Sequence, residues 1–368
     1  MSLNSFLTRW KSDPSIAPNI SSWQVFPKRE PEYAELPLNL DHRLKSYLAS
    51  LGIHSLYLHQ YQAWQEVQSG HNIAQVTGTA SGKTLSYMLP VLHNLLENDS
   101  RRALFLYPTK ALAHDQLDVL KAFSAVISAA YDGDTPSSHR AGIRSSSQII
   151  VSNPDMLHLG ILPYHIHWED FFSNLRYIVL DEMHTYRGVF GSHVANVIRR
   201  LKRVATHYGS SPQFLLTSAT IGNPLAHAEA LIEEKVQLID KDYSSRGEKH
   251  FLIFNPPIID DVLGLRVGMQ RESVRLASEI INAGYQTILF GRSRKSVEFM
   301  LTKLREKCSI PPDSISAYRS GYLPSQRREI EAGLRSGQIR AVAATTALEL
   351  GIDIGGLDAV IISGYPGS

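Results

Sequence analysis

The sequence TGTASGKT, from Thr77 to Thr84, decides the fold of the region around it. The run IAQV at 73–76 before it is typical of a buried strand, and the residues after it place leucines on one face of a helix. Two glycines in the loop lack the Cβ atoms that would keep a backbone away from a phosphate, and the helix N-terminus supplies partial positive charge. We therefore predict a phosphate-binding loop made of Thr77, Gly78, Thr79, Ala80, Ser81, Gly82, Lys83 and Thr84.

Two side chains of this loop have predicted tasks in nucleotide binding. Lys83 would reach the terminal phosphates, and the Thr84 hydroxyl would bind Mg²⁺. The pattern departs from GxxxxGK[ST], because Thr77 stands where the first glycine belongs and Gly78 comes one place late. This departure weakens the match without breaking the mechanism, since GKT still stands at a strand-to-helix junction.

Length and composition limit the class of protein. The 368 residues suit two or more domains with hydrophobic cores. Lys+Arg 37 against Asp+Glu 35 leaves a net charge of +2, so any nucleic-acid-binding surface must be local. The single cysteine, Cys308, excludes an intramolecular disulfide and a zinc site of several cysteines, which favours a reducing, cytoplasmic setting. With no signal-peptide core and no apolar run of about 18 residues, we expect a soluble protein.

A second strand of the same predicted sheet ends in two acidic residues. The run YIVL at 177–180 precedes DEMH, in which Asp181 would hold Mg²⁺ and Glu182 would accept a proton from the attacking water. An Asp-Glu pair on a surface has no such meaning by itself. Its combination with GKT at one sheet edge favours a catalytic role for Lys83, Asp181 and Glu182.

Other polar residues are expected near the same sheet edge. Gln60 suits the reading of an adenine edge, but an ordinary surface amide is the alternative, and the residue pattern leaves both open. Thr109 and Lys110 follow the predicted strand 103–107, at the edge where ligands bind in open α/β sheets. The small hydroxyl residues of TSAT, at 217–220, would switch partners between the nucleotide and the domain interface.

The C-terminal part of the chain repeats the strand-helix pattern without a second phosphate loop. Strands are predicted at 287–290, 315–318, 339–344 and 359–363, and Arg, Ser or Thr heads the segment after most of them, which suits contact with a sugar-phosphate backbone. The fold class is therefore α/β with two parallel-sheet domains. We expect an N-terminal extension at 1–40, the first domain at 41–240, a linker at 241–270 and the second domain at 271–368.

Two further polar clusters have ordinary explanations. The basic residues of VIRRLKRV, at 197–204, are typical of a solvated helix face, with phosphate contact as the alternative. The three histidines His158, His165 and His167 match no metal-ligand spacing, so we predict packing and surface roles for them.

Eight motifs occur in the order of the superfamily 2 helicases: TGTASGKT, YPTKALAHDQ, SNPDML, DEMH, TSAT, FGRSRKSVE, YRSGY and ATTALELGIDIGGLDAV. The string DEMHTYRGVFGSHVANVIRRL resembles the mitomycin-repair-factor type, relatives of RecQ-like DNA helicases with a C-terminal cysteine-rich zinc-binding domain. The resemblance implies two RecA-like domains of a P-loop NTPase that use ATP and Mg²⁺. It also implies a motor that moves 3′ to 5′ on single-stranded DNA and acts in DNA repair. RNA is the less favoured alternative substrate.

The resemblance further implies roles for single residues. Gln60 would read adenine, Gly351 and Asp353 would face the nucleotide, and Ser218 and Thr220 would couple hydrolysis to domain motion. The residues implied to contact nucleic acid are Thr109, Lys110, Arg292, Ser293, Thr345 and Thr346.

The sequence departs from that family at its end. In the family, the strand corresponding to 359–363 is followed by a QxxGRxGR helix whose arginines reach the γ-phosphate, whereas this sequence ends at Ser368 with an incomplete second domain. Arginine fingers contribute about 10³ to 10⁵ in rate, so we expect this chain to bind ATP and Mg²⁺ but to hydrolyse ATP slowly. One reading is a helicase motor whose partner is a separately encoded C-terminal half. The other is a nucleotide-gated nucleic-acid-binding module.

Overall fold

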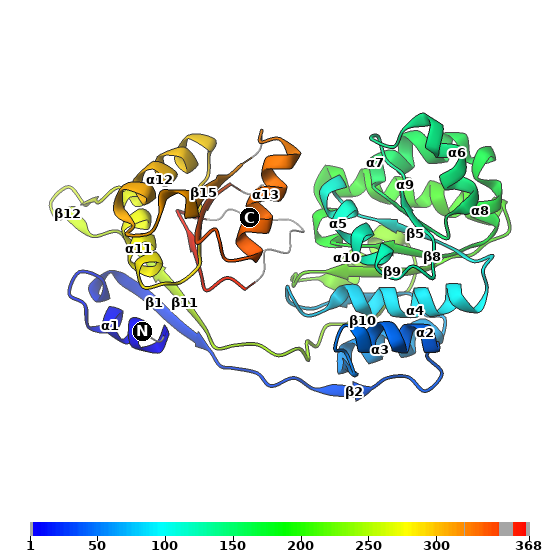
Figure 1. The fold of residues 1–368 in the computed structure, drawn as a ribbon, viewed down its shortest axis with the longest axis horizontal. Coiled ribbons are helices and arrows are strands. Elements are labelled where there is room, and N and C mark those ends of the chain that lie inside the picture. Colours follow the sequence, from blue (N-terminus) through cyan, green and yellow to red (C-terminus); the bar gives the residue numbers. More distant parts are fainter. Residues whose placement is uncertain (1–2, 320, 346–355, 366–368) are drawn as a thin grey trace. The chain divides into compact units, whose positions relative to one another are not determined.

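The computed structural model describes residues 3–319, 321–345 and 356–365 (Figure 1). The chain forms two compact units. One is continuous, Pro27–Glu248, and the other combines Met1–Phe26 with Lys249–Ser368. The α/β class predicted from the sequence is confirmed, because each unit is built around a parallel sheet.

The unit Pro27–Glu248 contains a seven-stranded sheet in the order β10-β4-β9-β8-β5-β7-β6. Every pairing between neighbours in it is parallel. Its strands are β4 (Ile73–Val76), β5 (Arg102–Leu106), β6 (Ser128–Ala130), β7 (Ile149–Ser152), β8 (Leu175–Leu180), β9 (Gln213–Ser218) and β10 (Gln237–Ile239). A short antiparallel pair, β2 (Tyr33–Glu35) with β3 (Ser55–Tyr57), lies outside this sheet.

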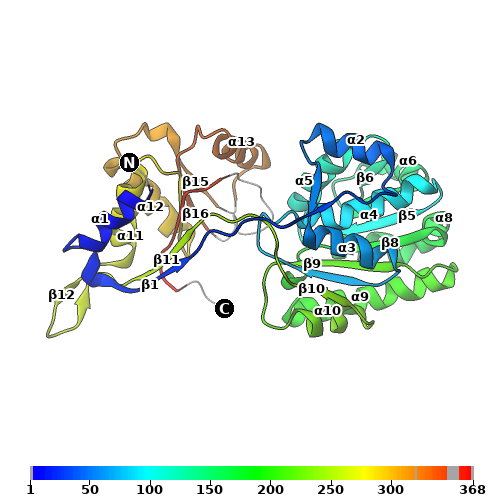
Figure 2. The same cartoon turned by 90° about the horizontal axis from the view of Figure 1, so that it is seen from below.

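Helices cover both faces of this sheet, because successive strand residues point to opposite sides. On β5, Ala103 and Phe105 join one core, whereas Leu104 and Leu106 join the other. The first core is completed by α2 (His42–Ser50), α3 (Leu58–Gln68), α4 (Lys83–Glu97) and α5 (Lys110–Lys121). The second is completed by α8 (Glu169–Ser173), α9 (Gly188–His207) and α10 (Pro224–Ile232), and α6 (Ser137–Ser146) packs beside it (Figures 1 and 2).

The carboxyl ends of the central strands lie at one edge of the sheet. Val76 at the end of β4 pairs with Ser218 at the end of β9, and Leu180 at the end of β8 pairs with Leu106 at the end of β5. The segments that follow these strands are the phosphate loop, TSAT, DEMH and PTK. The parallel register therefore gathers four of the predicted motifs at one edge.

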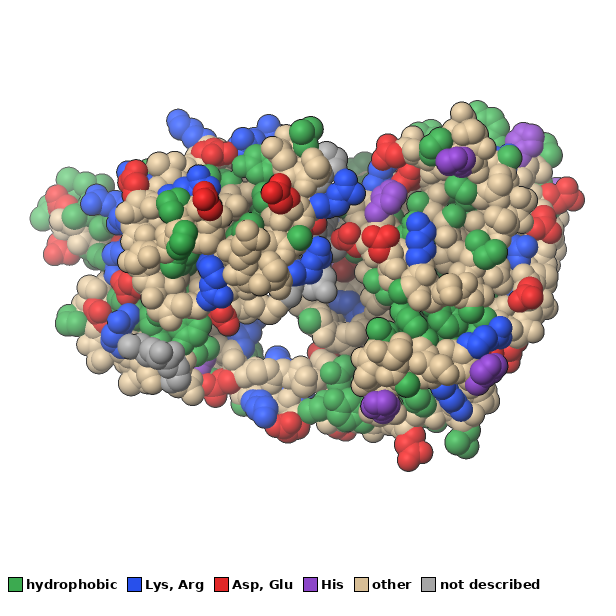
Figure 3. Space-filling model, in the orientation of Figure 1, with side chains coloured by type: hydrophobic (Ala, Val, Ile, Leu, Met, Phe, Trp, Pro, Cys, Tyr) green, Lys and Arg blue, Asp and Glu red, His purple; other side chains and the backbone are tan. Residues whose placement is uncertain are grey.

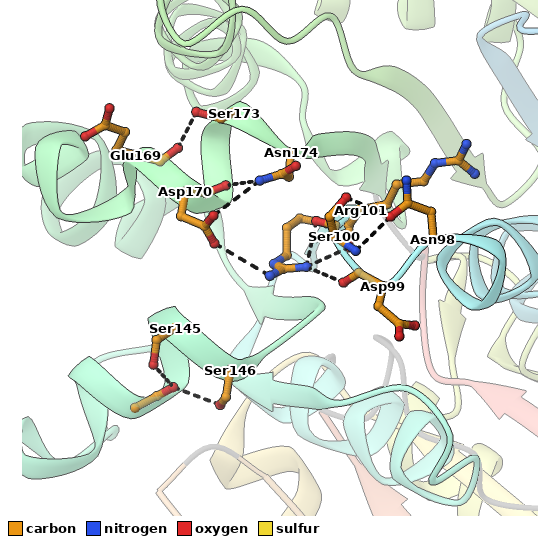
Figure 4. A network of polar contacts seen from close by, with 12 residues as sticks. Asn98, Asp99, Ser100, Arg101, Ser145, Ser146, Glu169, Asp170, Ser173 and Asn174 are labelled. Atoms are coloured by element: carbon orange, nitrogen blue, oxygen red, sulfur yellow. Dashed lines mark hydrogen bonds and ion pairs between the residues drawn. The ribbon is translucent and has the colours of Figure 1, made fainter.

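At the opposite edge, a polar network lies between the turn that contains Asp99 and Ser100 and the segment that contains Asp170 and Asn174 (Figure 4). The residue that joins them is Arg102, the first residue of β5. Its guanidinium donates hydrogen bonds to the backbone oxygens of Asp99 at 2.8 Å and Ser100 at 2.6 Å, and pairs with Asp170 at 3.6 Å. Its backbone N–H donates to Asn174 O at 2.9 Å. The turn before β5 is thereby tied to the segment before β8, which fixes the strands far from the motif edge.

The second unit has a four-stranded parallel sheet in the order β15-β16-β14-β17. Its strands are β14 (Thr287–Phe290), β15 (Ile315–Tyr318), β16 (Ala341–Ala344) and β17 (Ala359–Ile362), and its helices are α11 (Met269–Asn282), α12 (Arg294–Lys307) and α13 (Pro324–Arg335). Two of these strands begin and end where the sequence predicts, and the other two differ by one or two residues.

The N-terminal residues belong to this second unit, which differs from the single extension 1–40 expected from the sequence. Helix α1 (Leu3–Ser12) buries Phe6 and Trp10 against Leu276 and Ile280 of α11. Strand β1 (Ile20–Phe26) pairs antiparallel with β11 (Lys249–Phe254). The chain changes unit after Phe26 because these long-range contacts bind the first residues to the second sheet.

The expected linker 241–270 is also more structured than its composition suggests. It contains β11 and a small antiparallel pair, β12 (Ile258–Asp260) with β13 (Leu265–Arg266), before α11 begins at Met269. The prolines at 256–257 only separate two strands. In the described part of the chain, no helix has the length and apolar character needed to cross a membrane.

Candidate functional site

The phosphate loop between β4 and α4 is closed by the residue that breaks the sequence pattern. The Thr77 side chain is fully buried, and its Oγ1 lies 2.6 Å from Ser81 Oγ on the far side of the loop. The backbone takes left-handed conformations at Ala80 (φ 60°) and Gly82 (φ 77°). A glycine is therefore not required at position 77, where a hydroxyl holds the two ends of the loop together.

The two glycines of the loop are sites of close approach. A Cβ atom on Gly82 would lie 2.5 Å from Gln60 Nε2, and one on Gly78 would lie 3.2 Å from Asp242 Oδ2. The left-handed φ of Gly82 adds strain to any larger residue. The loop thus forms a narrow cradle in which neither position accepts a side chain without movement.

Helix α3 holds the loop through two side chains. Gln60 Nε2 donates to Gly82 O at 3.0 Å, while its Oε1 accepts from the Tyr57 N–H at 2.9 Å. The buried His59 places Nε2 2.9 Å from Ser81 O. Gln60 has only 5% of its surface exposed, so the alternative of an ordinary surface amide is wrong. Both ends of its amide are used by backbone groups, so Gln60 positions the loop. The adenine contact stays a prediction.

Lys83 is the first residue of α4, and its ammonium group is folded over the loop. Its Nζ donates to Thr77 O at 3.2 Å and to Gly78 O at 3.4 Å. These partners are neutral carbonyl oxygens, so they leave the charge of the ammonium group uncompensated. A positively charged group at a helix N-terminus is suited to binding an anion.

Asp181 follows β8 and is almost completely buried, with 6% of its surface exposed. Its Oδ1 accepts from the Glu182 N–H at 2.8 Å and from the Thr217 hydroxyl of β9. Its Oδ2 accepts from the Tyr87 hydroxyl of α4 at 3.4 Å. Donors from α4, from β9 and from the next residue in the chain therefore fix the orientation of this carboxylate.

Glu182 is a carboxyl group of the site with a raised pKa. Burial, and then the neighbouring Asp181 carboxylate, raise its pKa from 4.5 to about 7, whereas Lys83 opposes the rise. Its backbone is left-handed (φ 51°), and its Oε2 has no hydrogen-bond partner among the described residues. A carboxylate with a pKa near 7 and an unused oxygen suits a general base.

His184 links the acids to TSAT. Its Nδ1 lies 3.3 Å from Glu182 Oε2, outside hydrogen-bond geometry, and 3.4 Å from Ser218 Oγ. Burial, followed by Lys83, lowers its pKa, so the contact with Glu182 involves a neutral imidazole. Ser218 is buried at the end of β9, whereas Thr220 is exposed.

Thr109 and Lys110 lie where β5 passes into α5. Thr109 is the N-cap of α5, and its Oγ1 accepts from the Leu112 N–H at 3.3 Å. Lys110 is half exposed and pairs with Asp134 at 2.9 Å. Both residues lie at the motif edge, next to the acids in strand order.

The remaining predicted residues belong to the second unit. Ser293 is the N-cap of α12 and accepts from the Ser296 N–H at 3.1 Å. The exposed Arg292 donates to Tyr365 O at 2.6 Å, and the Thr345 N–H donates to Tyr318 O at 3.1 Å. The predicted residues Thr346, Gly351 and Asp353 lie outside the described residues.

Sequence reasoning missed the buried groups behind the acids. Tyr87 and Tyr107 are fully buried, and their hydroxyls lie 3.2 Å apart beside Asp181. Thr217 was noted only as part of TSAT. One signal could have indicated them. A tyrosine stands where an aliphatic residue is usual, on the buried face of α4 and at the end of β5, and a buried tyrosine hydroxyl usually has a hydrogen-bond partner.

The basic helix 197–204 and two of the three histidines, His158 and His165, make contacts within the protein. Arg199 pairs with Glu233 at 2.5 Å and Lys202 with Glu234 at 2.6 Å, while Arg200 contacts His158. His165 contacts Tyr208 Oη at 2.8 Å. Figure 3 shows acidic and basic side chains interspersed on the face in view, in keeping with the small net charge.

A set of oxygen ligands suited to Mg²⁺ is present at the motif edge. The described residues contain no group of three or more His, Cys, Asp or Glu side chains that could hold a metal. Mg²⁺ in phosphoryl-transfer sites needs fewer, because one or two oxygen side chains and the phosphates of the substrate complete its shell. The Thr84 hydroxyl, the Asp181 carboxylate and the narrow glycine cradle fit that arrangement.

Two family models match the chain, one in each unit. The DEAD/DEAH box helicase domain matches residues 57–228, and the helicase conserved C-terminal domain matches residues 272–368. Together with the tandem parallel sheets and the motif edge, they show that the chain belongs to the DEAD/DEAH-box helicases of superfamily 2.

Within that superfamily the chain is similar to a group of ATP-dependent helicases. It is 48% identical over 369 residues to the uncharacterized ATP-dependent helicase YprA of Bacillus subtilis, covering 98% of this chain and 49% of the relative. It is 38% identical to the ATP-dependent helicase hrq1 of Schizosaccharomyces pombe, covering 93% of this chain and 34% of the relative.

A solved structure matches the chain over its whole length. The crystal structure of the DUF1998 helicase MrfA bound to DNA gives a TM-score of 0.96 at 47% identity, covering 100% of this chain and 50% of that one. MrfA bound to DNA and AMPPNP gives a TM-score of 0.95 at the same identity. The chain thus spans about half the length of MrfA and YprA.

Proposed function

We propose that this chain is the motor part of an ATP-dependent DNA helicase. The observation that carries the proposal is the meeting of TGTASGKT with Asp181 and Glu182 at the carboxyl ends of β4 and β8, which flank β9. A phosphate cradle beside a buried carboxylate and a general base is the arrangement that nucleoside triphosphate hydrolysis needs.

The proposed roles follow from the contacts. The loop N–H groups from Thr77 to Thr84 hold the phosphates, and the Lys83 ammonium neutralises the terminal ones. Deprotonated Glu182 takes a proton from water, which its raised pKa and unused Oε2 favour. Ser218 and Thr220 pass the state of the site to the rest of the motor, and His184 lies near both Ser218 and Glu182.

We propose that Thr84 and Asp181 hold Mg²⁺. When bound, this ion neutralises charge on the phosphates and orients them. Asp181 presents a carboxylate whose direction is fixed by Tyr87, Thr217 and the Glu182 N–H. The second unit is proposed to supply Gly351 and Asp353 on the nucleotide side.

Nucleic acid is the proposed partner, and DNA is favoured because MrfA is described as bound to DNA. Thr109 and Lys110 of the first unit and Arg292, Ser293, Thr345 and Thr346 of the second are the proposed contacts. Movement from 3′ to 5′, a role in DNA repair and a cytoplasmic location remain predictions from the sequence.

Steady-state ATP turnover with and without single-stranded DNA tests the proposal. We expect the chain to bind ATP in the presence of Mg²⁺, and any turnover to be stimulated by DNA. Glu182→Gln should retain ATP binding and abolish turnover, because it keeps the shape of the side chain but cannot take a proton. Lys83→Ala should lose binding itself.

The outcomes separate the two readings of the sequence. DNA-stimulated turnover that disappears in Glu182→Gln supports the motor. ATP binding with turnover no higher than in Glu182→Gln supports a nucleotide-gated nucleic-acid-binding module instead. Equal binding of ATP by the wild type and Lys83→Ala would contradict the proposed site.

A further inference from the structure

One buried hydroxyl connects the two residues that would hold the metal. Tyr87 lies on α4 three residues after Thr84, so the two side chains share a helix face. Its Oη donates to Asp181 Oδ2 at 3.4 Å, and its hydroxyl also hydrogen bonds with the Thr84 side chain. Tyr87 is fully buried, so this hydroxyl is shielded from solvent by the described residues.

The direction of the hydrogen bonds around Tyr87 can be deduced. A phenol has one proton, and Tyr87 gives it to Asp181, because a carboxylate can only accept. In the 3.2 Å contact between the Tyr87 and Tyr107 hydroxyls, Tyr107 must therefore be the donor. The chain from Tyr107 through Tyr87 to Asp181 has a single direction, which fixes the rotation of the Tyr87 O–H bond.

We propose that Tyr87 is a positioning residue for metal-dependent nucleotide binding. It holds the Asp181 carboxylate at a constant angle to Thr84, and Tyr107 holds Tyr87 in turn. This inference rests on the proposed function. Groups that orient a metal ligand through hydrogen bonds typically contribute about 10-fold to 100-fold to metal affinity.

A second tyrosine provides a matched control. Tyr186 is also buried, but its hydroxyl oxygen has no hydrogen-bond partner among the described residues. Tyr186→Phe and Tyr87→Phe each remove one buried hydroxyl from the same unit. They differ in whether that hydroxyl supports Asp181.

Fluorescently labelled ADP provides the test, because its binding can be measured without turnover. Its affinity is measured in EDTA and over a range of Mg²⁺ concentrations for the wild type and both variants. Tyr87→Phe should raise the Mg²⁺ concentration needed for half-maximal tightening by about tenfold, with the affinity in EDTA unchanged. Tyr186→Phe should leave both quantities unchanged, and Tyr107→Phe should shift the Mg²⁺ requirement less than Tyr87→Phe.

The possible failures can be told apart. A Tyr87→Phe variant that loses affinity equally in EDTA and in Mg²⁺ would show that Tyr87 only maintains the structure, and an unchanged Mg²⁺ requirement would show that it positions nothing. Either result overturns this inference alone. Wild-type binding of ADP that ignores Mg²⁺ would overturn the proposed Mg²⁺ site as well, whereas ATP turnover tests the proposed function separately. Thermal unfolding of each variant without ligand checks that it is folded.

Discussion

At the scale of single residues, Glu182 combines burial with two charged neighbours of opposite sign. Its pKa of about 7 lies above the ordinary value of 4.5, so the folded state holds its proton more tightly than the unfolded state. Between these two pH values the unfolded chain releases the proton first, and the free energy of unfolding falls as the pH rises. Above pH 7 this decrease is complete, and the free energy of unfolding is then lower by about 3 kcal/mol than at pH 4.

Glu182→Gln should therefore stabilise the protein at high pH only. Near pH 5 its melting temperature should match the wild type, and at pH 8 it should be higher by several degrees, since glutamine cannot ionise. Glu30→Gln is the control, because the Glu30 side chain is 76% exposed. A difference between Glu182→Gln and the wild type that is constant from pH 5 to pH 8 would contradict the raised pKa.

Lys110, a proposed nucleic-acid contact, is paired with an acidic side chain in the structure. It forms an ion pair with Asp134 at 2.9 Å, and Asp134 is mostly exposed. Lys110→Ala should weaken binding of single-stranded DNA and reduce the slope of log affinity against log salt by about 0.7, whereas Asp134→Asn should strengthen binding. Fluorescence anisotropy over a salt series measures both quantities.

The same helix offers the control for this prediction. Lys121 ends α5 and is exposed at the far end from the motif edge. Lys121→Ala should leave the affinity and the salt slope unchanged. Equal losses for Lys110→Ala and Lys121→Ala would indicate a diffuse charge effect instead of a contact at Lys110.

At the scale of elements, helix α1 is a structural part of the second unit. Phe6 has 1% of its surface exposed and lies with its ring 5.9 Å from that of Tyr285, while Trp10 Nε1 donates to Glu279 at 3.0 Å. These contacts join α1 to α11 and to the start of β14. The helix therefore stabilises a sheet that lies more than 250 residues away in the sequence.

Phe6→Ala should destabilise the second unit selectively. Removal of a buried phenylalanine costs about 3–5 kcal/mol. Amide hydrogen exchange should show lost protection in β14 to β17 and unchanged protection in β4, β8 and β9. Leu3→Ala, on the exposed side of the same helix, should have little effect. Loss of protection in β4 would place α1 in the other unit.

The elements also show what the sequence could predict. The strand 73–76 was predicted to the residue, because an apolar run ending at a phosphate loop is a local signal. The placement of Asp181 and Glu182 directly after a buried strand was also predicted, because an apolar run followed by acids is a local signal. The roles of Thr77 and Tyr87 were not predictable, since they depend on which side chains meet across the loop and behind the sheet.

At the scale of the whole molecule, the tandem parallel sheets follow from the repeated strand-helix pattern. The pairing of β1 with β11 does not, because it joins segments more than 200 residues apart and neither strand has strict apolar alternation. From composition alone, we predicted that the segment containing β1 is an extension and that the segment containing β11 is a linker. Long-range antiparallel pairing leaves little trace in a local window of sequence.

This pairing has a topological consequence. Phe26 and Lys249 are the last partners of the β1–β11 ladder, and the whole unit Pro27–Glu248 is contained between them. The nucleotide-binding unit is thus inserted into the loop of a β-hairpin. Because the two ends of the outer unit face each other, a two-residue turn could join Phe26 to Lys249 and yield that unit as one continuous polypeptide.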